Sequence, residues 1–179
     1  QPYFMFYVLQ ATKAVNDIQL GLKLIDKWKP AVDSSTGTLK ENWQDVTSTG
    51  YGGDYSHAWA GAPLAYLSQN VLGIVPTNKP GQYSANLFHH NSINWAKGKI
   101  PTHSKTTIDL SWKKSSNEYV YTYTIPAGIS VEVVPPGDCG ACSLTVNNKK
   151  QNRDEPIQLG SGKHTIRLSI QKSRPDNEK

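Results

Sequence analysis

The fold of the second half is decided by Thr107-Ile-Asp-Leu-Ser-Trp112 and by the run that follows it, Tyr119-Val-Tyr-Thr-Tyr-Thr-Ile125. Every second residue of each run suits a buried sheet face, which is typical of half-buried strands. Similar runs cover residues 129–133, 143–146 and 164–170, with turn residues such as Pro135-Pro-Gly and Gly160-Ser-Gly between them. Short strands separated by frequent turns predict an antiparallel β-sandwich over residues 86–170, followed by a polar tail at 171–179.

The first half has a different pattern, which predicts helices. Residues 2–13 begin with an apolar run that is unbroken from Tyr3 to Leu9. A helix with apolar residues on all sides must be enclosed all round, and left exposed it invites association. The chain therefore opens with a helix that needs partner helices.

Two further helices are expected before residue 85. The second begins at Asn16, with Gln19 as its capping-box partner, and ends at Pro30. The third has Ser56 as its N-cap and ends at Gly73. Three helices are too few to enclose their own apolar surface, so residues 1–85 are predicted to be an incomplete domain.

Composition and charge exclude some classes of protein. No apolar run reaches the roughly 18 residues that a membrane span needs. All of the net charge of +5 lies in residues 86–179, yet no run of cations is longer than two. This basic half could attract acidic polymers, but a solvated surface is favoured, and no nucleic-acid-binding motif is present. The chain opens at Gln1 without Met or a basic leader, which predicts a processed or trimmed product. We expect the mature chain to be secreted or extracellular.

The two cysteines lie close together in Cys139-Gly-Ala-Cys142. A redox motif of this spacing needs a strand-to-helix context, whereas here prolines precede it and a strand pattern follows. Zinc would need two further ligands, and no other Cys remains, so no metal site is predicted. A short-loop disulfide, slightly favoured, and two free thiols stay open as alternatives.

Residues typical of a carbohydrate site gather between the second and third helices. Glu41 and Trp43 lie in one segment, and His57 and Trp59 follow in the next. A carboxylate can act as acid or base in glycoside hydrolysis, aromatic rings stack on sugars, and a His can donate to hydroxyls. Asp45 and Asp54 are spare carboxylates nearby. The structural alternative is a capped helix with buried aromatics and a solvated Glu.

The order of several motifs resembles the last part of α-L-rhamnosidases of glycoside hydrolase family seventy-eight. The matching segments run in order from residue 2 to about 135: Pro2–Gln10, Gly37–Trp43, Ser56–Pro63, Leu72–Pro76, Trp95–Thr102 and Ile108–Trp112. The resemblance implies the last helices of an (α/α)6 catalytic barrel followed by a C-terminal β-sandwich, hence an α+β multidomain fold.

The resemblance also implies roles for the site residues. Glu41 matches the family's general base, which activates water in an inverting hydrolysis. His57 matches a sugar-contacting histidine, and Trp43 and Trp59 match aromatics near the pocket. Lys40 stands where the family usually has an aromatic residue, and a neighbouring cation favours the ionised carboxylate. No cofactor or metal is implied.

The family's general acid lies upstream of anything present in this chain. We therefore expect a C-terminal fragment that removes α-L-rhamnose from glycans only with an N-terminal fragment of the same precursor, and is not competent alone. Neither nucleic acid nor a membrane is an expected partner. A non-catalytic carbohydrate-binding or assembly module is the alternative function, and a stand-alone structural protein is the third.

Overall fold

The computed structural model describes residues 1–32, 38–43, 57–88, 90–137, 139 and 142–170. The chain forms two compact units, Gln1–Asn70 and Val71–Lys179. The predicted domain boundary after residue 85 is therefore too late. The reason is that the segment 74–86 forms two strands that pair within the second unit. The predicted tail, 171–179, lies outside the described residues.

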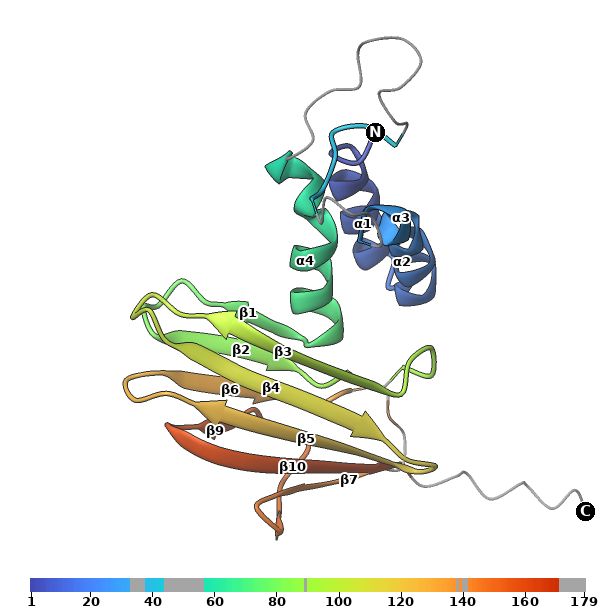
Figure 1. Cartoon of the computed structure of the whole chain (residues 1–179). Helices are drawn as coiled ribbons and strands as arrows, with labels where there is room; N and C mark the ends of the chain where they lie inside the picture. Colours follow the sequence, from blue (N-terminus) through green and yellow to red (C-terminus); the bar gives the residue numbers. More distant parts are fainter. Residues whose placement is uncertain (33–37, 44–56, 89, 138, 140–141, 171–179) are drawn as a thin grey trace, which may run out of the picture. The chain divides into compact units, whose positions relative to one another are not determined.

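The first unit is helical in its described parts (Figure 1). Its elements are α1 (Met5–Ala14), α2 (Ile18–Ile25), η1 (Asp26–Trp28), α3 (Lys29–Val32), η2 (Ala58–Gly61), α4 (Ala62–Tyr66) and η3 (Leu67–Val71), whose last residue belongs to the second unit. The three predicted helices are thus present as shorter helical segments. The (α/α)6 barrel is not formed by these helices alone.

The ends of the second helix differ from the prediction. Asp17, not Asn16, caps α2, because its carboxylate accepts a hydrogen bond from the Leu20 N–H over 2.9 Å. Asn16 instead has a φ of 55°, a left-handed conformation that Asn tolerates and that turns the chain between α1 and α2. Pro30 does not end the helix either. It lies in the first turn of α3, where its missing N–H costs no hydrogen bond.

The third predicted helix is divided into η2, α4 and η3. His57 occupies the N-cap position of η2, and the predicted cap Ser56 lies outside the described residues. The predicted stop at Gly73 agrees with its φ of 74°. A Cβ at this position would overlap the carbonyl oxygen of Asn86, so the close approach of the backbone also requires glycine.

A small apolar core holds the helical unit together. Leu9, Trp28, Ala62 and Tyr66 are its buried members, and Met5, Leu24, Ile25 and Leu39 pack against them. The Trp28 indole N–H donates to the Ala60 carbonyl oxygen over 2.8 Å, which fixes η1 to η2. Most of α1 stays outside this core: Tyr7 is 60% exposed, and Phe4, which directly precedes the helix, is 56% exposed. As predicted, the first helix is not enclosed by its own unit.

The second unit contains two sheets, and in Figure 1 the four-stranded sheet lies behind the six-stranded sheet. The strand orders are β1-β2-β6-β9 and β3-β4-β5-β10-β7-β8. The strands are β1 (Ile74–Pro76), β2 (Gln82–Asn86), β3 (Trp95–Pro101), β4 (Thr107–Lys114), β5 (Glu118–Ile125), β6 (Ser130–Val134), β7 (Cys142–Val146), β8 (Lys149–Lys150), β9 (Ile157–Leu159) and β10 (Gly162–Ile170).

All five predicted strands are present, as β4, β5, β6, β7 and β10. The sandwich is not purely antiparallel, however, because β2 and β6 pair in parallel from Gln82↔Ser130 to Asn86↔Val134. Alternate residues of β4 and β5 are buried between the sheets, as the period-two pattern requires. Trp112 stacks on Phe88 at a centroid distance of 4.7 Å, and its indole N–H donates to the Val71 carbonyl oxygen over 2.8 Å.

Candidate functional site

Leu39, near the start of the segment 38–43 that carries Glu41, anchors this segment to the helical core. Leu39 packs on the core, and its carbonyl oxygen accepts a hydrogen bond of 2.8 Å from the backbone N–H of His57. This bond joins the two segments that flank residues 44–56, so Glu41 lies two residues from the junction. Glu41 is half-buried, in a bend over residues 41–43. Two of the predicted site segments are thus brought together.

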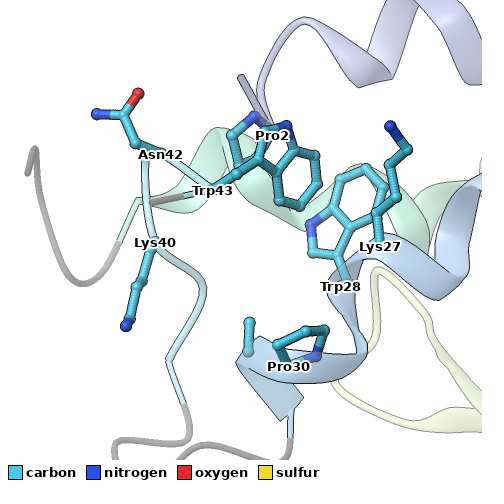
Figure 2. Close-up of a pocket in the computed structure, with 8 residues that line it drawn as sticks. Pro2, Lys27, Trp28, Pro30, Lys40, Asn42 and Trp43 are labelled. Carbon is cyan, nitrogen blue, oxygen red and sulfur yellow. The ribbon is translucent and has the colours of Figure 1, made fainter. Parts of the chain in front are cut away.

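Trp43 packs on Trp28 beside Glu41. The two indoles meet edge to face with their centroids 4.8 Å apart, a favourable arrangement for aromatic rings. They line a hollow of about 530 Å³ with Pro2, Lys27, Pro30, Ala31, Lys40 and Asn42 (Figure 2). Lys40 and Asn42 are the two neighbours of Glu41. In Figure 2 the Lys40 side chain extends away from the two indoles, so this hollow keeps an aromatic wall.

His57 and Trp59 lie at the start of η2. Their ring centroids are 6.5 Å apart, and the Trp59 ring lies 6.0 Å from that of Tyr3. Trp59 is 70% exposed and lines a second hollow of about 380 Å³ with Tyr3, Phe6 and Tyr7 of the N-terminal segment. The structure therefore places Trp43 in the first hollow and Trp59 in the second, with the His57–Leu39 hydrogen bond linking their segments.

The second carboxylate of a glycosidase pair is not identified in the described part of the helical unit. Besides Glu41, the carboxylates described there are Asp17 and Asp26. Asp17 caps α2, and Asp26 is an exposed residue at the start of η1. Asp45 and Asp54, the spare carboxylates noted in the sequence, lie outside the described residues. The described residues therefore offer one carboxylate beside the aromatic hollow.

Trp28 and Tyr3 are aromatic contacts of the site that sequence reasoning missed. Trp28 lies between two lysines and before Pro30, a context that resembles a solvated helix end. The residue type was the one available signal, because a tryptophan is often buried and its indole N–H then needs an acceptor. Tyr3 was noted only as part of an apolar run, and its proximity to Trp59 depends on packing that the sequence does not show.

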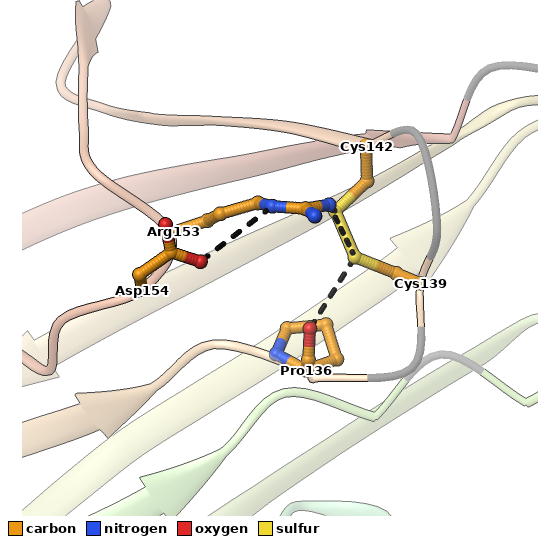
Figure 3. The surroundings of a disulfide bond; sticks show 5 residues. All are labelled: Pro136, Cys139, Cys142, Arg153 and Asp154. Carbon is orange, nitrogen blue, oxygen red and sulfur yellow. Dashed lines mark hydrogen bonds and ion pairs between the residues drawn. A yellow bond between two sulfur atoms is a disulfide. The ribbon is translucent and has the colours of Figure 1, made fainter.

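Cys139 and Cys142 form a disulfide in the structure, with their Cα atoms 5.8 Å apart (Figure 3). Arg153 donates from Nη1 to the Cys142 sulfur over 3.5 Å and to the Cys139 sulfur over 3.8 Å. The bridge lies in the sandwich unit, between β6 and β7, and a structural role fits it best. Among the described residues no His, Cys, Asp and Glu side chains gather in a group of three that could hold a metal ion.

No helix in the described part of the chain is both long and apolar enough to cross a membrane. No protein-family model matches the chain. In sequence it is 26% identical over 154 residues to the α-L-rhamnosidase of Alteromonas sp. (strain LOR), a match that covers 80% of this chain and 16% of that protein.

Solved structures show the same likeness in fold. The α-L-rhamnosidase from Dictyoglumus thermophilum superposes on 92% of this chain with a TM-score of 0.73 and 16% identity, using 20% of its own length. The enzyme from Streptomyces avermitilis, complexed with L-rhamnose, superposes on 78% of this chain with a TM-score of 0.55 and 20% identity, and the match covers 14% of its own length. The Aspergillus terreus enzyme superposes on 78% of this chain with a TM-score of 0.53 and 18% identity, and the match covers 15% of its own length.

The chain spans a fifth or less of each of these relatives. It shares with them a small helical part and a β-sandwich. The resemblance predicted from the ordered motifs is therefore confirmed: over most of its length, this chain is similar to a limited part of α-L-rhamnosidases.

Proposed function

We propose that this chain supplies the water-activating side of an inverting α-L-rhamnosidase site, with Glu41 as general base. The observation that supports this most is the hydrogen bond from His57 N–H to Leu39, which holds the Glu41 segment beside the His57–Trp59 segment. His57 would donate to a sugar hydroxyl, and Trp43 and Trp59 would contact the substrate. The substrate class is a glycan or glycoside that carries terminal α-L-rhamnose.

In this mechanism the Glu41 carboxylate takes a proton from a water molecule as the water oxygen attacks the anomeric carbon. A carboxylic acid on the opposite side of the sugar gives its proton to the glycosidic oxygen, and the configuration inverts. The two carboxyl groups need to lie about 6.5–9.5 Å apart to leave room for the water. That acid would come from another segment of polypeptide.

The exposed apolar surface of the helical unit supports such a complement. Phe4 just before α1, Phe6 and Tyr7 on α1 and Leu64 on α4 are all exposed, and Leu64 is 67% exposed. Large apolar side chains gathered on one small unit are typical of a surface that another polypeptide covers. We infer that the N-terminal part of the same secreted precursor packs here, completes an (α/α)6 barrel and brings the general acid.

The variant Glu41→Gln tests the assignment of the base. In the protein that carries the complete barrel, we expect hydrolysis of an aryl α-L-rhamnoside to fall by about 10²–10⁴-fold, the usual contribution of a general base. The matched control is Glu155→Gln, the same change at an exposed position of the sandwich unit. Turnover of E41Q equal to that of E155Q would remove Glu41 from the mechanism.

The second candidate function is a non-catalytic carbohydrate-binding or assembly module. It is favoured by Lys40, which replaces the usual aromatic residue, and by the 70% exposure of Trp59. This function predicts that the chain binds rhamnose-containing glycans and shows no hydrolysis beside its N-terminal complement. Measuring both binding and turnover of one preparation separates the two functions.

A further inference from the structure

The outward face of the six-stranded sheet carries six of the chain's 19 Lys and Arg residues. In β3 the buried Ile100 points inward, so Trp95, Lys97 and Lys99 point outward by alternation. The strand register then places Lys113 of β4, Lys163 and Arg167 of β10 and Lys150 of β8 on the same face. We name these seven residues the basic face; it belongs to the layer in front in Figure 1.

Trp95 lies between two cations on this face. It is directly opposite Lys113 in the β3–β4 register, which puts their Cβ atoms about 5 Å apart. Lys97 follows two residues along the strand, about 7 Å away. Trp95 is 68% exposed, and both lysines are exposed as well. An open indole flanked by two ammonium groups results.

The carboxylates on this face do not neutralise it. Asp109 pairs with Lys99 over 3.3 Å and Glu118 pairs with Arg167 over 3.0 Å. A hydrogen bond from the Thr107 hydroxyl, and then the ammonium group of Lys99, hold the pKa of Asp109 below its usual value. Six cations thus face two carboxylates. Within the described ranges, Lys97, Lys113, Lys150 and Lys163 form no ion pair.

Hydroxyl groups occupy the middle of the basic face. Ser111 of β4 lies opposite Lys97 on one side and Thr122 of β5 on the other, and Thr122 lies opposite Thr165 of β10. A sheet face with an exposed ring, separated cations and a row of hydroxyls suits an extended polymer with regularly spaced anions and apolar patches. A chain of uronate sugars has both features.

We propose that the basic face binds a uronate-bearing polysaccharide. Lys97 and Lys113 would pair with the carboxylates of two sugars, while Trp95 stacks on the ring of the sugar that lies between those two. The choice of a carbohydrate among polyanions rests on the proposed function, because an enzyme acting on acidic glycans gains from holding them close to its site. Complementary charge raises the local concentration of such a polymer.

The test is the dissociation constant of the full chain, with any polypeptide that co-purifies with it, for polygalacturonate at low salt. We expect Lys97→Gln/Lys113→Gln to weaken binding about 30-fold, because each cation near an anionic surface contributes about 1 kcal/mol. Trp95→Ala should weaken it too. The matched control is Lys23→Gln/Lys79→Gln, which removes the same charge from exposed positions outside the basic face.

Equal loss of affinity in the two double variants would overturn the proposal, because it would show an effect of net charge alone. Duplex DNA bound as tightly as polygalacturonate, or no binding to either, would overturn it as well. The proposed function has a separate readout. Glu41→Gln should bind polygalacturonate normally, and the basic-face variants should hydrolyse a small aryl rhamnoside at the original rate.

Discussion

Three tyrosines of β5 are buried in the same core but differ in the hydrogen bonds that their hydroxyl groups make. Tyr119, Tyr121 and Tyr123 all point between the sheets, and burial raises the pKa of each above the usual value of a tyrosine. The Tyr121 hydroxyl donates to the Phe88 carbonyl oxygen. The buried Tyr123 hydroxyl has no hydrogen-bond partner in the part of the chain that the structure describes.

This difference predicts opposite effects of the same substitution. Tyr121→Phe leaves the buried Phe88 carbonyl without its donor and should lower the free energy of unfolding by about 1–3 kcal/mol. Tyr123→Phe removes a buried hydroxyl that makes no bond, so stability should stay unchanged or rise. Urea unfolding followed by near-UV circular dichroism measures both. A larger loss in Tyr123→Phe than in Tyr121→Phe would contradict the hydrogen-bond assignment.

At the scale of elements, the presence of helices could be predicted from the sequence, but the residues at which they begin and end could not. The apolar run from Tyr3 and the Pro and Gly signals indicate where helices lie. Asp17 caps α2 instead of Asn16 because Asn16 takes up the left-handed turn between two helices. That turn depends on how α1 packs on α2, a contact that the local sequence does not contain.

The packing of α2 gives a prediction at this scale. Gly21 is buried, and a Cβ there would overlap the Tyr66 hydroxyl of α4. Gly21→Ala should therefore destabilise the helical unit, although Ala normally favours a helix interior by about 0.5–1 kcal/mol. At Gly61 nothing lies within 4 Å of an added Cβ, so Gly61→Ala is the matched control. Thermal unfolding with equal midpoints for both variants would mean that α2 and α4 do not pack this closely.

At the scale of the whole molecule, the sandwich was predictable because β4, β5, β6, β7 and β10 each carry their own period-two pattern. The parallel pairing of β2 with β6 was not, since it joins segments that are far apart in sequence and β2 is short and polar at its ends. The same missed pairing explains why the boundary at residue 85 was placed too late. Which strands pair with each other depends on the tertiary fold, and the local sequence pattern of a strand does not show it.

The candidate site stays a prediction, and the structure adds only which of its segments lie together. Ordered motifs identified Glu41, Trp43, His57 and Trp59, and the structure links their segments through Leu39 and His57. Trp28 escaped notice because its role comes from its contact with Trp43. A second carboxyl group on another segment stays a prediction of the family resemblance, which the residues of this chain alone do not provide.

The most direct measurement is the rate of aryl α-L-rhamnoside hydrolysis by this chain alone, by the upstream polypeptide of its precursor alone, and by the two mixed at equal concentration. We expect the mixture to be active and each part to be inactive, because each would hold one of the two carboxyl groups that the inverting reaction needs. Hydrolysis by this chain alone at the rate of the mixture would contradict the proposal that it holds one side of the site.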